Sequence, residues 1–134
     1  MVAYSFKAQF EDAIVDGTKR QTVRGFRKRH ARPNEPMQLF TAMRTRQCRK
    51  ILTPDPICLD VRHIAIAHGS QQPLHIEIEG RALDLAEIES FACADGFDDL
   101  EFAGGLASRR MSDFWLQEHG PLAFSGVVIR WKPA

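Results

Sequence analysis

Three side chains near the start of the chain have types and spacing that could support chemistry. They are Lys19, Thr22 and Arg24, in the segment Gly17-Thr18-Lys19-Arg20-Gln21-Thr22-Val23-Arg24. Arginine binds phosphate through a planar fork, lysine supplies a point charge, and threonine is a small donor, acceptor or nucleophile. Because neighbouring cations lower the pKa of a lysine, Lys19 could act as a base for Thr22. The segment predicts a site for an anionic or nucleobase-bearing ligand.

The geometry of this site depends on how the chain turns after residue 17. Apolar residues recur at helical spacing over about 7–16 and predict a helix there, which Gly17 ends in a left-handed conformation. On an extended segment over 20–24, Arg20, Thr22 and Arg24 share one face, and Gln21 and Val23 share the other. On one straight strand Lys19 and Thr22 would face opposite ways. Lys19 and Thr22 can therefore meet only if residues 18–20 still belong to the turn.

The charge of the chain is divided unevenly along the sequence. Residues 1–50 hold twelve Lys/Arg against four Asp/Glu, a net of +8, whereas residues 51–134 hold six against thirteen, a net of −7. Such asymmetry predicts an anionic partner such as phosphate or nucleic acid. The candidate phosphate contacts lie in the loop 25–36 and in the run 44–50: Arg27, Lys28, Arg29, Arg44 and Arg46. A solvated surface, or docking of an acidic protein, would explain the same charges.

The remaining pattern predicts an α+β fold. Strands are expected at 2–6, 37–43, 58–67, 74–79 and 124–131, with the run 44–50 continuing the second of these. Glu79-Gly80 predicts a hairpin turn, and Asp84 with Glu87 predicts a capping box for a helix to about residue 94. A last helix contains Met111 and Trp115, and Gly104-Gly105 links the two helices. This order predicts a single domain over 1–134, a small mixed or antiparallel barrel with appended helices.

Composition argues against several other classes of protein. No stretch of eighteen apolar residues and no signal-peptide layout is present, so we expect a cytoplasmic protein with no membrane segment. The three cysteines form no CxxC pair, and the five histidines lack the spacing of metal ligands. No metal and no cofactor are predicted.

Five short motifs together resemble the ASCH domain family of the PUA-like superfamily, over about Tyr4 to Trp131. They are Gly17-x-Lys19-x-x-Thr22-x-Arg24, Pro33-x-Glu35-x-Met37-x-Leu39, Asp95-Gly96-Phe97, Met111-x-x-Phe114-Trp115 and Phe124-x-Gly126-x-x-Ile129-x-Trp131. The resemblance implies a small PUA-like β-barrel with flanking α-helices and a cleft for RNA or a modified nucleoside.

The resemblance also implies candidate catalytic residues. Some members of the family remove the acetyl group of N4-acetylcytidine with a lysine, a threonine and a later acidic residue, and the matching positions here are Lys19, Thr22 and Asp95. Asp95 stands where those members have glutamate, and the basic loop 25–36 is an insertion. Other members are described as RNA-binding or ribonucleolytic.

The leading prediction is an RNA- or nucleotide-binding domain whose cationic cleft contains Lys19, Thr22, Arg24 and Asp95. An amidohydrolase acting on a modified pyrimidine nucleoside, a ribonuclease and a protein-interaction module are the alternatives, and the oligomeric state is left open.

Overall fold

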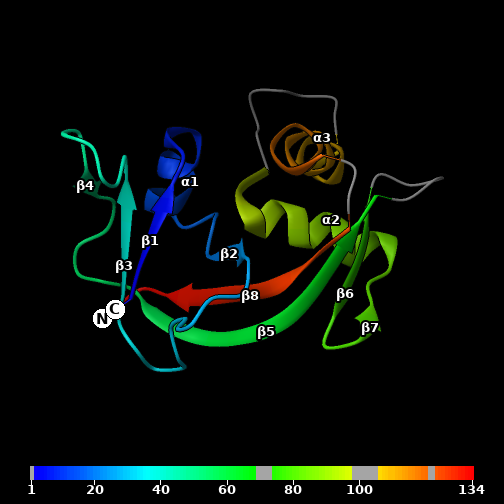
Figure 1. The fold of residues 1–134 in the computed structure, drawn as a ribbon, viewed down its shortest axis with the longest axis horizontal. Helices are drawn as coiled ribbons and strands as arrows, with labels where there is room; N and C mark the ends of the chain where they lie inside the picture. The colour runs from blue at the N-terminus through cyan, green and yellow to red at the C-terminus, as the bar shows by residue number, and fades with distance from the viewer. Residues whose placement is uncertain (1, 69–73, 98–105, 121–122) are drawn as a thin grey trace.

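The computed structural model describes residues 2–68, 74–97, 106–120 and 123–134. Its smaller sheet has three strands in the order β1-β3-β4, namely β1 (Val2–Phe6), β3 (Met37–Thr41) and β4 (Arg49–Lys50). β1 and β3 run parallel, and β3 and β4 run antiparallel. In Figure 1 these strands stand at one end of the molecule, beside the first helix.

The larger sheet has five antiparallel strands in the order β2-β8-β5-β6-β7. They are β2 (Gln21–Arg24), β8 (Phe124–Lys132), β5 (Ile57–Ala67), β6 (His75–Ile78) and β7 (Arg81–Ala82). β5 and β8 form the long, curved centre of this sheet in Figure 1. Among the described residues, an isolated antiparallel bridge between Pro36 and Ile57 links the two sheets. The mixed α+β class predicted from the sequence is confirmed.

Helices lie near the start of the chain and on one side of the larger sheet. A 3-10 turn (Ala8–Phe10, η1) leads into α1 (Glu11–Asp16), while α2 (Leu85–Ala92), η2 (Cys93–Phe97) and α3 (Ala107–His119) follow the hairpin. α2 lies between the larger sheet and α3 (Figure 1). The predicted capping box is present, since the Asp84 side chain accepts from the Glu87 N–H and the Glu87 carboxylate accepts from the Asp84 N–H.

The hairpin was predicted correctly, but the predicted strand over 44–50 was wrong. Glu79 and Gly80 both have positive φ, 50° and 80°, as a two-residue hairpin turn requires. After Thr41, however, Ala42 and Arg44 also have positive φ, which ends β3 two residues early. The chain then turns, and only residues 49–50 return to pair with β3. The predicted linker Gly104-Gly105 lies outside the described residues.

The core lies between the two sheets and beneath the helices. Tyr4, Met37, Leu39, Ile76 and Ile129 are almost completely buried. The ring of Phe6 in β1 meets the indole of Trp131 in β8 edge-on at 6.0 Å, which joins the sheets. Among the described residues, no helix is both long and apolar enough to cross a membrane.

Candidate functional site

Lys19 lies in a turn and not in a strand. Gly17 adopts the left-handed conformation with φ 87° and ends α1. The Lys19 N–H then donates to the Ala13 carbonyl at 3.0 Å, and β2 begins only at Gln21. The extended segment predicted over 20–24 is therefore one residue too long. This shortening lets Lys19 turn toward the same pocket as Thr22, which a straight strand would prevent.

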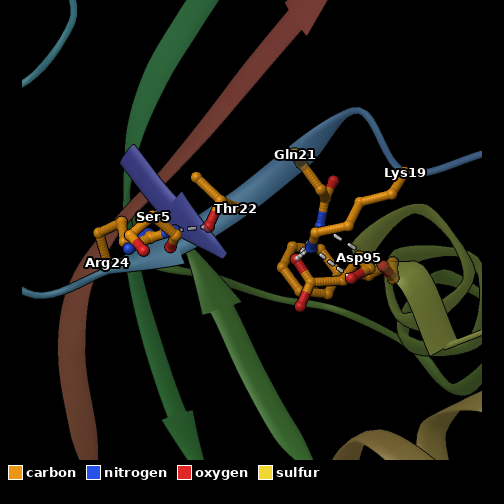
Figure 2. A network of polar contacts seen from close by, with 7 residues as sticks. Ser5, Lys19, Gln21, Thr22, Arg24 and Asp95 are labelled. Carbon is orange, nitrogen blue, oxygen red and sulfur yellow. Dashed lines mark hydrogen bonds and ion pairs between the residues drawn. The ribbon is translucent and has the colours of Figure 1, made fainter. Parts of the chain in front are cut away.

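The Lys19 side chain meets Asp95 across 76 positions of sequence. Its Nζ donates to the Asp95 backbone carbonyl at 2.5 Å and lies 3.7 Å from Asp95 Oδ1 (Figure 2). It also lies 4.8 Å from the centre of the Phe10 ring, a cation–π contact. Gln21 Nε2 also donates to Asp95 Oδ1, at 3.3 Å. Lys19 is 3% exposed and Asp95 5%, so the two groups form a buried polar pair.

Burial shifts the pKa values of Lys19 and Asp95 in the directions that favour the neutral form of each group. Loss of water lowers the pKa of Lys19, and the charge of Asp95 opposes that effect. Loss of water also raises the pKa of Asp95, opposed first by the charge of Lys19 and then by the Gln21 hydrogen bond. Each shift reduces the cost of moving a proton from the lysine to the carboxylate. The neutral forms of the two groups therefore lie closer in free energy to the charged pair than they would in water.

Thr22 is buried, and its hydroxyl is held by Arg24 on the same face of β2. Arg24 Nε donates to Thr22 Oγ1 at 3.0 Å, and Arg24 Nη2 donates to the Ser5 carbonyl at 2.6 Å. The guanidinium lies over the rings of Phe6 and Tyr4, at 4.8 and 5.3 Å from their centres. Figure 2 shows that Thr22 and Arg24 lie at one end of the polar network and Lys19 and Asp95 at the other.

These four residues line one pocket of about 270 Å³. β2 forms one wall, and η1, η2, α3 and the start of β8 supply most of the others. Six of the lining side chains are aromatic: Phe6, Phe10, Phe97, Phe114, Trp115 and Phe124. The sequence patterns indicated several of these as core residues and none as part of a ligand site. His119, which packs on Trp115 at 4.4 Å between ring centres, also lines the pocket and was missed.

The predicted phosphate contacts are separated in space. Arg27 lies over the Tyr4 ring at 4.5 Å, and Arg24 contacts the same ring at 5.3 Å. Lys28 is exposed, and the exposed Arg29 forms an ion pair with Glu35. Arg44 and Arg46 are exposed on the connection from β3 to β4 and line no part of this pocket. Arg27 is thus linked to Arg24 through the Tyr4 ring, whereas the other four cations lie on loops, and none of the five lines the pocket.

A second cavity, of about 420 Å³, lies between the larger sheet and α2. Gln21, Arg62, Val128 and Arg130 line it from the sheet. Both arginines are engaged with Asp60, Arg130 through two hydrogen bonds and Arg62 at 3.6 Å. Gln21 connects the two cavities, because it lines this one while its amide binds Asp95. Within the described parts of the chain, no cluster of three or more His, Cys, Asp or Glu side chains could hold a metal ion.

Comparison with known proteins adds no homologue to this description. No protein-family model matches the chain, and no match was found among curated proteins or among solved structures. The interpretation of the site therefore depends on its geometry and on the motif resemblance described above.

Proposed function

We propose that this chain is an ASCH-type, PUA-like domain that binds RNA or a nucleotide, with a base inserted into the pocket beside Lys19, Thr22 and Arg24. The observation that supports this most is the combination of aromatic walls and cationic groups in a single pocket of about 270 Å³. The bridge from Pro36 to Ile57, which joins the two sheets, is consistent with a PUA-like barrel. The barrel itself stays a prediction.

The residues in and beside the pocket suit the base and the phosphate of a nucleotide. Flat aromatic rings offer stacking surfaces for a base, and each stacked base contributes about 1–3 kcal/mol to binding. The Thr22 hydroxyl and the Lys19 side chain offer polar partners for the edge of the base. Arg24 is held by Ser5 and Thr22, and Arg27 contacts the same Tyr4 ring as Arg24. The two guanidinium groups at this point would bind a phosphate.

Calorimetric titration with cytidine 5′-monophosphate and with a short single-stranded cytidine RNA tests the proposal. Arg24→Ala should weaken both ligands by about ten- to a hundredfold, because hydrogen bonds to a charged group are worth about 1.5–3 kcal/mol. RNA affinity should also fall steeply between about 50 and 200 mM salt as counterions are released.

A matched control separates the pocket from general charge. Arg109→Ala removes the same charge from an exposed position on α3 that does not line the pocket. It should change affinity much less than Arg24→Ala. Equal losses from the two variants would mean nonspecific attraction, and no binding of either ligand to the wild-type protein would refute the proposal.

A second function, hydrolysis of an acyl-amide on a modified pyrimidine nucleoside, is favoured by the buried Lys19 with its lowered pKa. In this mechanism neutral Lys19 Nζ takes the Thr22 hydroxyl proton while Thr22 Oγ1 attacks the amide carbonyl. The carbon–nitrogen bond breaks, the amine leaves with the proton from Lys19, and the acyl group stays on Thr22 as an ester. Water, deprotonated by Lys19, then hydrolyses that ester and restores the hydroxyl.

Two rearrangements are required for this chemistry. The Thr22 hydroxyl now accepts from Arg24, and Lys19 Nζ donates to Asp95, so both must turn toward the substrate. Incubation with N4-acetylcytidine should then release cytidine, Thr22→Ser should retain turnover, and Thr22→Ala and Lys19→Met should abolish it. Absence of cytidine release by a wild-type protein that binds the nucleoside would leave binding as the function.

A further inference from the structure

We propose that the ligand is single-stranded RNA and not a free nucleoside, and that the exposed ring of Phe26 stacks on a base adjoining the one in the pocket. This inference rests on the proposed function and adds a second base-binding position to it. The position lies at the start of the basic loop, where neither the motif resemblance nor the helical and strand patterns assign a role.

Phe26 lies next to the pocket-lining end of β2 in the sequence, at the start of the basic loop. Arg24 and Gly25 line the pocket, and Phe26 follows them directly in the chain. Its side chain is 62% exposed, and among the exposed large apolar side chains of the described residues it is the only phenylalanine, tyrosine or tryptophan. The ring is nevertheless held in place, since it meets the imidazole of His63 in β5 edge-on at 5.7 Å. A braced aromatic surface is therefore offered to solvent beside the pocket.

Strand register fixes the direction from the pocket to this ring. Arg24 in β2 pairs with Val127 in β8, and Val127 pairs with His63 in β5. Paired residues of neighbouring strands point to the same face, so Arg24 and His63 lie on one face of the sheet. Two strand spacings separate them by about 10 Å. An extended single strand crosses that distance within a couple of nucleotides.

The charges around Phe26 suit the backbone of such a strand. Arg27 and Lys28 follow it immediately, and Arg24 precedes it by two positions. Aromatic rings that stack bases, set within a cationic track that binds phosphates, are the usual composition of single-strand binding surfaces. The charges thus favour a nucleic acid strand over an apolar peptide as the partner that stacks on this ring.

Titrations of Phe26 variants with the monophosphate and with a short cytidine RNA test the inference. Phe26→Ala should weaken RNA binding by about tenfold, the loss of one stacked base, and leave monophosphate binding unchanged. Phe26→Tyr keeps the ring and should retain RNA affinity. Val15→Ala truncates another exposed apolar side chain, 59% exposed and outside the pocket, and should change neither ligand.

The outcomes separate this inference from the proposed function. If the wild-type protein binds the monophosphate as tightly as the RNA, or if Phe26→Ala weakens both ligands equally, the second base-binding position is refuted while the pocket stands. If neither ligand binds the wild-type protein, the proposed function fails first. Circular dichroism of Phe26→Ala and Phe26→Tyr before titration checks that each variant is folded.

Discussion

Lys19 and Asp95 form a buried pair whose loss should change both stability and its pH dependence. Their side chains are 4% and 7% exposed, and the charged atoms lie 3.7 Å apart. With an effective dielectric constant of about 20, attraction at that distance is about 4.5 kcal/mol. Desolvation of each ion costs several kcal/mol, so the net contribution of the pair is small, and removal of one partner leaves the other desolvated without compensation.

Asp95→Asn removes the charge and keeps the shape of the side chain. We expect the free energy of unfolding to fall by about 3 kcal/mol, at the lower end of the range for broken buried pairs. The loss is limited because Lys19 Nζ keeps its hydrogen bond to the residue 95 carbonyl and its contact with the Phe10 ring. Lys19→Met should cost a similar amount. The double variant should cost clearly less than the sum, since it leaves no unpaired charge.

The two single variants should respond to pH in opposite directions. In Lys19→Met, burial keeps the pKa of Asp95 raised. The contribution of Asp95 to stability is therefore fully present below the pKa of the unfolded state, about 3.9, and is lost as pH rises through the pKa of the folded state. In Asp95→Asn, burial keeps the pKa of Lys19 lowered. Its contribution is present above the unfolded pKa, about 10.4, and is lost as pH falls through the folded pKa.

Urea denaturation over a range of pH measures both effects. Trp115 beside the pocket and Trp131 in the core provide fluorescence signals. Asp113→Asn, an exposed carboxylate on α3, is the matched control and should change stability by less than about 0.5 kcal/mol. The reasoning is wrong if Asp95→Asn costs no more than Asp113→Asn, or if both pair variants shift with pH in the same direction.

Two backbone features give further predictions, both measured by urea denaturation. Gly96 has φ 100°, and a Cβ at this position would lie 2.8 Å from Lys19 Cδ and 3.0 Å from Phe10 Cδ1. Gly96→Ala should therefore lower the free energy of unfolding by about 2 kcal/mol or more and weaken ligand binding. Gly25→Ala meets no atom within 4 Å and serves as its control; an equal loss there would contradict the argument. Asp84→Ala removes the N-cap of α2 and should cost about 1 kcal/mol, whereas Asp84→Asn should cost much less.

Features set by neighbouring residues were predictable from the sequence. The capping box, the Glu79-Gly80 turn and the end of α1 at Gly17 each depend on residues within a few positions of one another. Prediction from neighbouring residues was wrong for the run 44–50. Its alternation resembles a strand, yet Ala42 and Arg44 take left-handed conformations that neither residue type prefers, and Thr45 donates back to the Ala42 carbonyl.

The candidate site was only partly predictable because it is assembled over long distances. The polar residues of β2 were predictable from the local sequence. The hydrogen bond from Arg24 to the Ser5 carbonyl and the contact of Arg24 with the Tyr4 ring were not. A backbone carbonyl carries no sequence signal. The contact between Gln21 and Asp95 was also not predictable, because the alternation of β2 assigns Gln21 to the face opposite Thr22.

Two glycines decide whether Lys19 and Asp95 meet, and each acts through backbone conformation. Gly17 reverses the chain after α1, so that Lys19 leaves the alternation of β2 and turns into the pocket. Gly96, at φ 100°, bends the chain at the end of the widened turn after α2, and the preceding Asp95 directs both its carbonyl and its carboxylate at Lys19 Nζ. Because an ordinary side chain is strained at either position, the geometry of the pair depends on these two residues as much as on the charged groups themselves.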